Sequence, residues 1–264
     1  MRRLAAAHKQ LAAAWLTRGG LHGERREAES RRAMRLIGLD ERRQFFFRLP
    51  DGRVLDFMDD IVERLELLFA ELEPASVFVP AFEGGHPDHD GAQLAAFTAL
   101  KRRERKGSRS RISAAAEDNG LTAKNAAGIS AKSTAVLSPG RPVLYEFPLY
   151  NRAGTRTLNV GRFIPGTTPV EQTPMKLKDR LLKRKLAGLF RSQRAILWPL
   201  TGLRGGPMMV HVTGEPYRRV PLDRDFTIRP HPGRLAYEYY TTRRFRDFAE
   251  VAARVANVEK RQSR

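Results

Sequence analysis

The sequence predicts an α/β fold, a Rossmann-like sandwich with a mostly parallel sheet. Strand-like and helix-like segments alternate through the first hundred residues, the strand-like runs are short and apolar, and Gly or Pro marks several of their ends. With 264 residues, of which 41% are hydrophobic, the chain is long enough for a real core. This composition excludes a wholly disordered protein.

Strand and helix patterns follow one another three times in residues 1–100. Apolar runs predict strands at 11–16, 44–49 and 76–79, and helical composition predicts helices at 24–37, at 61–72 and from 92. Gly38 stands at the expected stop of the first helix, and Pro50-Asp51-Gly52 closes the second strand with a strong turn signal. This order implies parallel βαβ units.

The rhythm stops at residues 101–141. Residues 101–111 (KRRERKGSRSR) are almost entirely basic, and residues 113–138 are rich in Ala, Ser, Gly, Asn and Lys without an apolar period. Such a segment buries too little surface to offset the entropy of ordering it. We therefore expect residues 101–141 to be a flexible basic insertion, either a solvated loop or a polyanion-binding arm. The single domain would comprise residues 1–100 and 142–264.

Regular patterns return after the insertion. Strands are expected at 142–150, interrupted by Pro148, at 158–164 and at 208–212, and helices at 173–198 and 242–255. The first of these helices has Leu177, Leu181 and other apolar residues at three- and four-residue spacing.

The chain is strongly basic, with 48 Lys and Arg against 29 Asp and Glu, a net charge of +19. Such a surface attracts polyanions, so weak contact with nucleic acid or an anionic membrane through residues 101–111 is one prediction. The absence of cysteine excludes disulfides, thiol nucleophiles and cysteine-based zinc sites. The sequence also lacks a P-loop, Gly-x-Gly-x-x-Gly and Gly-x-Ser-x-Gly, which argues against nucleotide binding and serine esterase chemistry.

No apolar run reaches the roughly 20 residues that a membrane-spanning helix needs. The opening MRRLAAAHKQLAAAW has the basic start of a signal peptide, but Lys9 and Gln10 interrupt its apolar stretch and no cleavage site follows. We therefore expect a cytoplasmic protein, with a mitochondrial-type presequence as the alternative.

The strongest chemical signal is the stretch Glu83-Gly84-Gly85-His86-Pro87-Asp88-His89-Asp90. It follows a predicted strand and precedes a predicted helix, which is where open α/β sheets place ligands. Imidazole is the commonest metal ligand at neutral pH, and a neighbouring carboxylate can fix its tautomer. The residues alone leave two interpretations open: a metal or acid–base site, or a structural loop with Asp caps.

This stretch resembles the second metal motif of the PIG-L/LmbE-like de-N-acetylases, zinc hydrolases that remove acetyl groups from N-acetylglucosamine-type substrates. Five further segments resemble that family in the same order: Trp15 to Gly20 (WLTRGG), Arg26 to Glu29 (REAE), Leu36 to Leu39 (LIGL), Leu49 to Gly52 (LPDG) and Tyr145 to Tyr150 (YEFPLY). The resemblance covers residues 4–100 and 142–165 well, and residues 174–248 loosely.

The resemblance implies a role for each matching residue. His89 would be a zinc ligand, and His86 and Asp88 would be catalytic, His86 facing the tetrahedral intermediate and Asp88 supporting the site. The substrate-binding residues would be Arg26, Asp51 and Thr17. Two other interpretations stay open: Arg26 and Glu29 as an exposed helix pair, and Asp51 as only a turn residue.

One part of the family pattern has no counterpart in the sequence: the first strand and the Ala-His-Pro-Asp-Asp-Glu motif after it. That motif supplies a His and an Asp as zinc ligands and an Asp as general base, and neither His8 nor His22 has a ligand-like context. In a doubly wound sheet the first strand lies near the middle, so without it two neighbouring strands would be unpaired. We expect a late-assigned start codon or a truncated gene, or else a folded non-catalytic homologue.

Two functions therefore compete. The first is a zinc-dependent hydrolase of a linear amide C–N bond in an N-acetylated sugar or glycoconjugate, with doubtful activity in this chain. The second is a polyanion-binding protein that uses its basic surface. Two further histidines carry weaker expectations: His211 as a core residue of an apolar strand, and His231 as a loop residue that could touch substrate.

Overall fold

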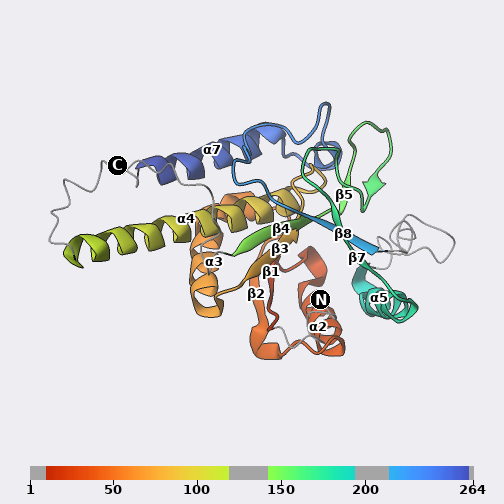
Figure 1. Cartoon of the computed structure of the whole chain (residues 1–264). Helices are drawn as coiled ribbons and strands as arrows, with labels where there is room; N and C mark the ends of the chain where they lie inside the picture. The colour runs from red at the N-terminus through yellow and green to blue at the C-terminus, as the bar shows by residue number, and fades with distance from the viewer. Residues whose placement is uncertain (1–9, 119–141, 194–213, 262–264) are drawn as a thin grey trace.

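Figure 1 shows the computed structural model of the chain, which describes residues 10–118, 142–193 and 214–261. The α/β prediction is confirmed: in the first hundred residues, strands β1 (Ala13–Thr17), β2 (Gln44–Leu49) and β3 (Ser76–Pro80) alternate with helices α2 (Gly23–Leu36), α3 (Met58–Leu72) and α4 (Pro87–Asp118). The later elements are β4 (Val143–Phe147), β5 (Tyr150–Asn151), β6 (Asn159–Val160), β7 (Glu171–Pro174), α5 (Leu177–Leu189), β8 (Gly214–Arg219) and α7 (Phe245–Arg261).

The longer strands form two sheets. β1 pairs in parallel with β2, with Ala13 opposite Gln44. β3 pairs in parallel with β4, with Phe78 opposite Tyr145, and β8 and β7 extend this sheet in antiparallel fashion to give the order β3-β4-β8-β7. The short strands β5 and β6 pair only with each other.

The division between the sheets falls between β1 and β3. Each of these strands has one hydrogen-bonded neighbour, and no other strand of the described ranges pairs with its second edge. Only Val79 of β3 is buried, while Phe78 is 44% exposed, whereas a central strand of a parallel sheet is covered on both faces. The sequence predicts two strands with an unpaired neighbour position, but it does not specify which strands they are.

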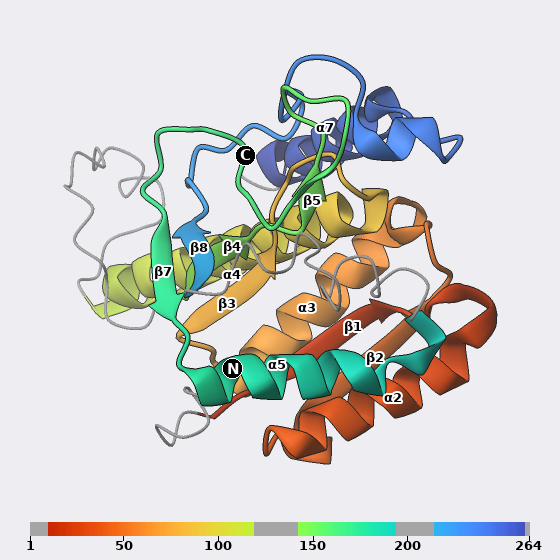
Figure 2. The same cartoon turned by 90° about the vertical axis from the view of Figure 1, so that its right-hand side faces the viewer.

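Helices cover both faces of the strands. In both views, α3 and α4 lie on one side and α2 and α5 on the other (Figures 1 and 2). The core lies on the α3 and α4 side, because Ile61 of α3, Ala95 of α4 and Phe248 of α7 are all fully buried there. The amphipathic pattern of α3 thus directs its apolar face onto α4 and the strands.

The basic segment that begins at residue 101 differs from the expectation. Residues 101–118 continue α4 as helix, while residues 119–141 lie outside the described residues. Glu66 of α3 accounts for this order, because it forms ion pairs with Arg102 (3.7 Å) and with Lys106. Arg103 also donates a hydrogen bond to the Glu66 backbone oxygen (3.4 Å). The basic run is therefore partly neutralised by α3.

Other predicted boundaries shift. The helix expected at 173–198 is shorter, since residues 171–174 form strand β7 and α5 ends at Leu189. The strand expected at 142–150 divides into β4 and β5 around Pro148, and β8 was not anticipated. The strand expected at 208–212, with His211, lies outside the described residues. No helix in the described part of the chain has the length and apolar character to cross a membrane.

Candidate functional site

The Glu83–Asp90 stretch joins β3 to α4. Pro87 is the first residue of α4, a position where its missing N–H leaves no hydrogen bond unmade. The His86 carbonyl oxygen accepts from the backbone N–H groups of His89 (3.1 Å) and Asp90 (3.2 Å). The two histidines therefore lie on a defined helical turn at the carboxyl end of β3, where the sequence predicts the site.

Three buried carboxylates hold this stretch by accepting hydrogen bonds from backbone amides. Asp90 accepts from Glu83 (3.1 Å) and Gly84 (3.2 Å). Glu83 accepts from Leu149 (2.7 Å) and Tyr150 (2.8 Å). The amides of Glu83 and Gly84 are buried, so losing the Asp90 carboxylate would leave them without partners.

The third carboxylate, Asp88, connects the stretch to the turn after β2. Its two oxygens accept from the backbone N–H groups of Gly52 (2.6 Å) and Val54 (3.1 Å). This contact places the Asp51 turn beside the histidines, as the resemblance implies. Asp88 is therefore a positioning residue, since both of its oxygens are bound to amides.

The three residues assigned to substrate also lie together. Thr17, at the end of β1, donates its hydroxyl to Asp51 (3.0 Å), and Arg26 of α2 lies 3.9 Å from the same carboxylate. Gly19 makes room for this arginine, because a Cβ at Gly19 would lie 2.3 Å from Arg26 Nη1. Asp51 therefore contacts side chains from β1 and α2 in addition to closing its turn.

The alternative pairing of Arg26 with Glu29 is wrong. Glu29 accepts from Arg25 (3.3 Å) and from the Ser192 backbone (3.0 Å) and hydroxyl (2.5 Å). Arg26 instead forms its ion pair with Asp51.

The two histidine rings lie side by side, with centroids 5.0 Å apart. Burial, with a smaller effect of His86, lowers the pKa of His89 to about 3, so its imidazole is neutral and can act as a ligand. His86 Nδ1 accepts a hydrogen bond from the Asp88 backbone N–H (3.1 Å). Because Nδ1 accepts, the neutral His86 ring carries its proton on Nε2 and is a donor through that atom.

Two tyrosines to which the sequence assigns no role in the site lie beside the histidines. The ring of Tyr150 meets His89 edge-on at 5.7 Å, and that of Tyr240 lies 6.3 Å from His86. The Tyr240 hydroxyl donates to the Gly85 carbonyl oxygen (2.5 Å). The YEFPLY motif marked Tyr150, but no local pattern marks Tyr240, which is 155 positions away from Gly85.

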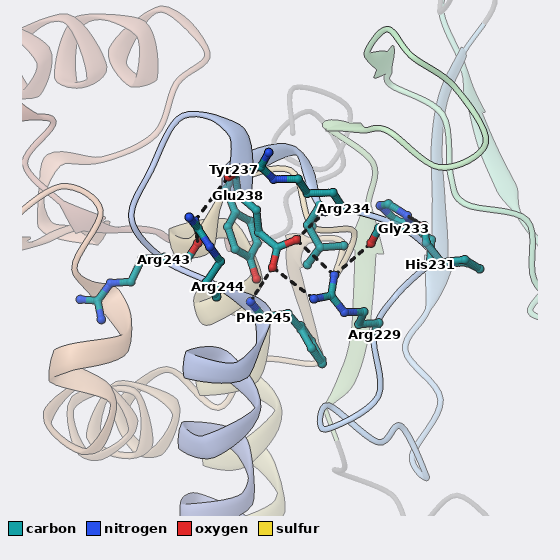
Figure 3. Close-up of polar contacts among 12 residues, drawn as sticks. Arg229, His231, Gly233, Arg234, Tyr237, Glu238, Arg243, Arg244 and Phe245 are labelled. Atoms are coloured by element: carbon teal, nitrogen blue, oxygen red, sulfur yellow. Dashed lines mark hydrogen bonds and ion pairs between the residues drawn. The ribbon is translucent and has the colours of Figure 1, made fainter.

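A network around Glu238 holds the segment that carries Tyr240 (Figure 3). Glu238 accepts from the backbone N–H groups of Leu235 (2.8 Å) and Phe245 (2.9 Å) and from both terminal nitrogens of Arg229 (3.1 and 3.2 Å). His231 is 4% exposed, with Nδ1 2.7 Å from the Pro232 oxygen. This loop fixes the position of Tyr240.

The described residues do not complete a catalytic metal centre. Such a centre takes about three protein ligands, and the described ranges contain no group of three or more His, Asp or Glu side chains arranged to hold an ion. His89 offers one neutral imidazole, whereas Asp88, Asp90 and Glu83 are bound to backbone amides. His22 lies in the 3-10 turn Gly20–His22, and His8 and His211 are outside the described residues.

Glu83 gives the site a pH dependence. Burial raises its pKa from 4.5 to about 7, so its stabilising contribution is complete below about pH 4.5 and is lost as the pH rises through about 7. The lowered pKa of His89 has the opposite effect, because it makes the free energy of unfolding decrease as the pH falls below 6.5. The variant Glu83→Gln separates the two, because its neutral side chain does not titrate.

We expect the free energy of unfolding of the unmodified chain, relative to Glu83→Gln, to fall by about 3 kcal/mol between pH 4.5 and 8. Urea denaturation at a series of pH values measures this difference. A difference that does not change with pH would show that Glu83 titrates normally.

Comparisons with solved structures concern the fold. The chain has a TM-score of 0.50 and 12% identity to a deacetylase in the biosynthesis pathway of teicoplanin, over 83% of this chain and 89% of that one. It has the same TM-score and 15% identity to the A40926 pseudoaglycone deacetylase Dbv21, over 88% and 90%. The zinc-inhibited form of teicoplanin deacetylase Orf2 gives 0.50 and 11%, over 83% and 90%. At these identities the likeness establishes the α/β fold.

The family comparison is more specific. The sequence model of the family "PIG-L: GlcNAc-PI de-N-acetylase" matches residues 1–100, which include Thr17, Arg26, Asp51 and the two histidines. This match confirms, over residues 1–100, the resemblance to PIG-L-type de-N-acetylases predicted from the motifs. No curated protein matches the chain.

Proposed function

We propose that the site binds an N-acetylated amino sugar of the N-acetylglucosamine type, as in a de-N-acetylase. The observation that carries this proposal is a series of contacts across the site. Thr17 donates to Asp51, the Asp88 carboxylate binds the Gly52 amide next to Asp51, and the Asp88 backbone N–H donates to His86. These contacts bring Thr17 and Asp51, at the ends of β1 and β2, beside an imidazole donor at the end of β3. The family match over the same residues supports it.

His86 is the group suited to the acetyl carbonyl. Its Nε2 carries the proton, its side chain is 24% exposed, and Asp88 holds the turn on which it lies. A hydrogen bond from Nε2 to the carbonyl oxygen would strengthen as negative charge develops on that oxygen. His86 would thus both select the acetylated substrate and stabilise an oxyanion.

Asp51 and Arg26 are suited to the sugar hydroxyl groups. They are accessible, with side chains 40% and 34% exposed. Asp51 accepts from hydroxyls, as it already does from Thr17, and the Arg26 guanidinium donates.

A bound zinc ion would supply Lewis acidity and an activated water for hydrolysis. The described residues offer His89 for it and no complete ligand set, so we derive no step through the metal. The cytoplasmic location and the contact of residues 101–111 with polyanions stay predictions.

Ligand-observed NMR titration tests the proposal without requiring turnover. N-acetylglucosamine is compared with glucosamine, which lacks the acetyl group, on the unmodified chain, His86→Ala and Asp51→Asn. We expect a preference for the acetylated sugar that His86→Ala reduces by up to about tenfold, the size of one hydrogen bond. Asp51→Asn should weaken both sugars.

Asp60→Asn is the matched control, because Asp60 also pairs with an arginine and its side chain is 44% exposed. Equal binding of the two sugars, or equal losses in Asp51→Asn and Asp60→Asn, would contradict the proposal.

A further inference from the structure

Helix α5 is an amphipathic helix with an uncovered outer face. It carries five basic residues and one acidic residue in its sequence LKDRLLKRKLAGL, and none of its residues is fully buried. In Figure 2, α5 lies in front of β1 and β2 as the outermost layer on that side of the molecule. Its inner side packs on α2.

The outer face combines leucines with cations. Leu177 and Leu181 are one turn apart and are 69% and 58% exposed, and Arg184 continues the same row. Lys178 and Lys185 are exposed beside them. Leucines are normally buried in a water-soluble surface helix, so two neighbouring ones turned outward indicate a contact surface.

Three cations of this face have no ion pair within the part of the chain that the structure describes. Of the basic side chains on α5, Lys183 pairs with Glu215 on the inner side (2.5 Å), whereas no carboxylate of the described residues forms an ion pair with Lys178, Arg184 or Lys185. Along α4 the situation is different, since Arg102 and Lys106 share Glu66. Free positive charge therefore accompanies exposed apolar surface on α5.

We infer that the outer face of α5 docks the protein on an anionic lipid surface. The leucines would enter the boundary between headgroups and acyl chains, while Lys178, Arg184 and Lys185 contact the anionic headgroups. The net charge of +19 gives the whole molecule the complementary sign. A nucleic acid would use the cations but would gain nothing from Leu177 and Leu181, which favours the lipid surface.

Vesicle co-sedimentation of the full chain tests this inference. The probes are vesicles of phosphatidylcholine alone and vesicles containing about 30% phosphatidylglycerol. We expect binding to the anionic vesicles that weakens with added salt. Arg184→Glu with Lys185→Glu should lower the partition coefficient at least about 25-fold, from about fivefold per lost cation. Leu177→Glu with Leu181→Glu should lower it by about tenfold or more.

Two control variants test, respectively, the loss of an exposed leucine elsewhere and the change in net charge alone. Leu67→Glu alters a leucine of α3 that is 67% exposed, and Arg35→Glu with Arg246→Glu changes the net charge by the same amount as the α5 pair. Both controls should keep most of the binding. Equal losses in controls and α5 variants, or equal binding to neutral vesicles, would overturn the inference.

Two further readouts separate other occupants of this face. Thermal melting of Leu177→Glu with Leu181→Glu should match the unmodified chain, and a marked fall would show that another part of the protein covers the face and would overturn the inference. A short single-stranded RNA is the second probe. RNA binding that depends on the α5 cations, without vesicle binding, would replace the lipid surface by a nucleic acid.

Discussion

Replacing Glu146 by Ala is expected to lower the free energy of unfolding by about 3–5 kcal/mol. Glu146 lies in β4 with its side chain fully buried and accepts from Arg218 (2.6 Å), Arg224 (3.1 Å) and Gln93 (2.5 Å). Its removal leaves two nearly buried guanidinium groups without a carboxylate. Arg218 also belongs to β8, so the change acts directly on the β4–β8 pair.

Urea denaturation of Glu146→Ala and Glu171→Ala measures this effect. Glu171 is the matched control because it is also a strand glutamate with a hydrogen bond, from the Tyr217 hydroxyl (2.9 Å), but it is exposed. We expect less than about 1 kcal/mol there. Similar losses in the two variants would show that the buried charges contribute little.

The same strand shows what the sequence could predict. Its apolar run and the YEFPLY motif predicted β4, but they did not indicate that Arg218 and Arg224, 72 and 78 positions away, neutralise Glu146. β8 was missed because its sequence GEPYRR contains Gly and Pro and few residues typical of strands. Its pairing with β4 and β7, which local composition does not encode, determines it.

The basic segment after Leu100 was misjudged for a different reason. The lack of an apolar period suggested an insertion, but Lys, Arg and Glu are good helix formers and α4 is already nucleated at Pro87. Adding turns to an existing helix needs no new apolar face, and Glu66 supplies a local partner. Periodicity predicts packing more reliably than it predicts where a long helix ends.

The candidate site was largely predictable where its residues are close in sequence. The Glu83–Asp90 stretch indicated the histidines, and the family resemblance indicated Thr17, Arg26 and Asp51. Neither the stretch nor the resemblance showed that the carboxylates of Asp88, Asp90 and Glu83 all accept hydrogen bonds from backbone amides. These hydrogen bonds come from Gly52, Leu149 and Tyr150, which lie far from the stretch in sequence. They matter for function because a carboxylate bound to amides is less available as a metal ligand.

The purified chain is expected to retain much less than one equivalent of zinc after dialysis. The described residues contain no group of three or more His, Asp or Glu side chains arranged to hold an ion, and tight catalytic zinc takes about three ligands. Disturbing even the residues that orient ligands costs about 10–100-fold in metal affinity, so missing whole ligands should cost more. Elemental analysis of the dialysed chain and of His89→Ala measures the zinc content, and we expect the two to be the same.

Acetate release from N-acetylglucosamine should follow the zinc content. A positioned general acid or base contributes about 10²–10⁴-fold to rate. The carboxylates beside the histidines accept hydrogen bonds from backbone amides, so they are not free to serve as the general base. With added zinc we therefore expect the chain and His89→Ala to release acetate at the same low rate. This expectation would be contradicted if the unmodified chain retained one equivalent of zinc and released acetate, and if His89→Ala lost both the zinc and the hydrolysis. It would show that residues outside the described ranges, such as His8 or His211, complete the centre with His89.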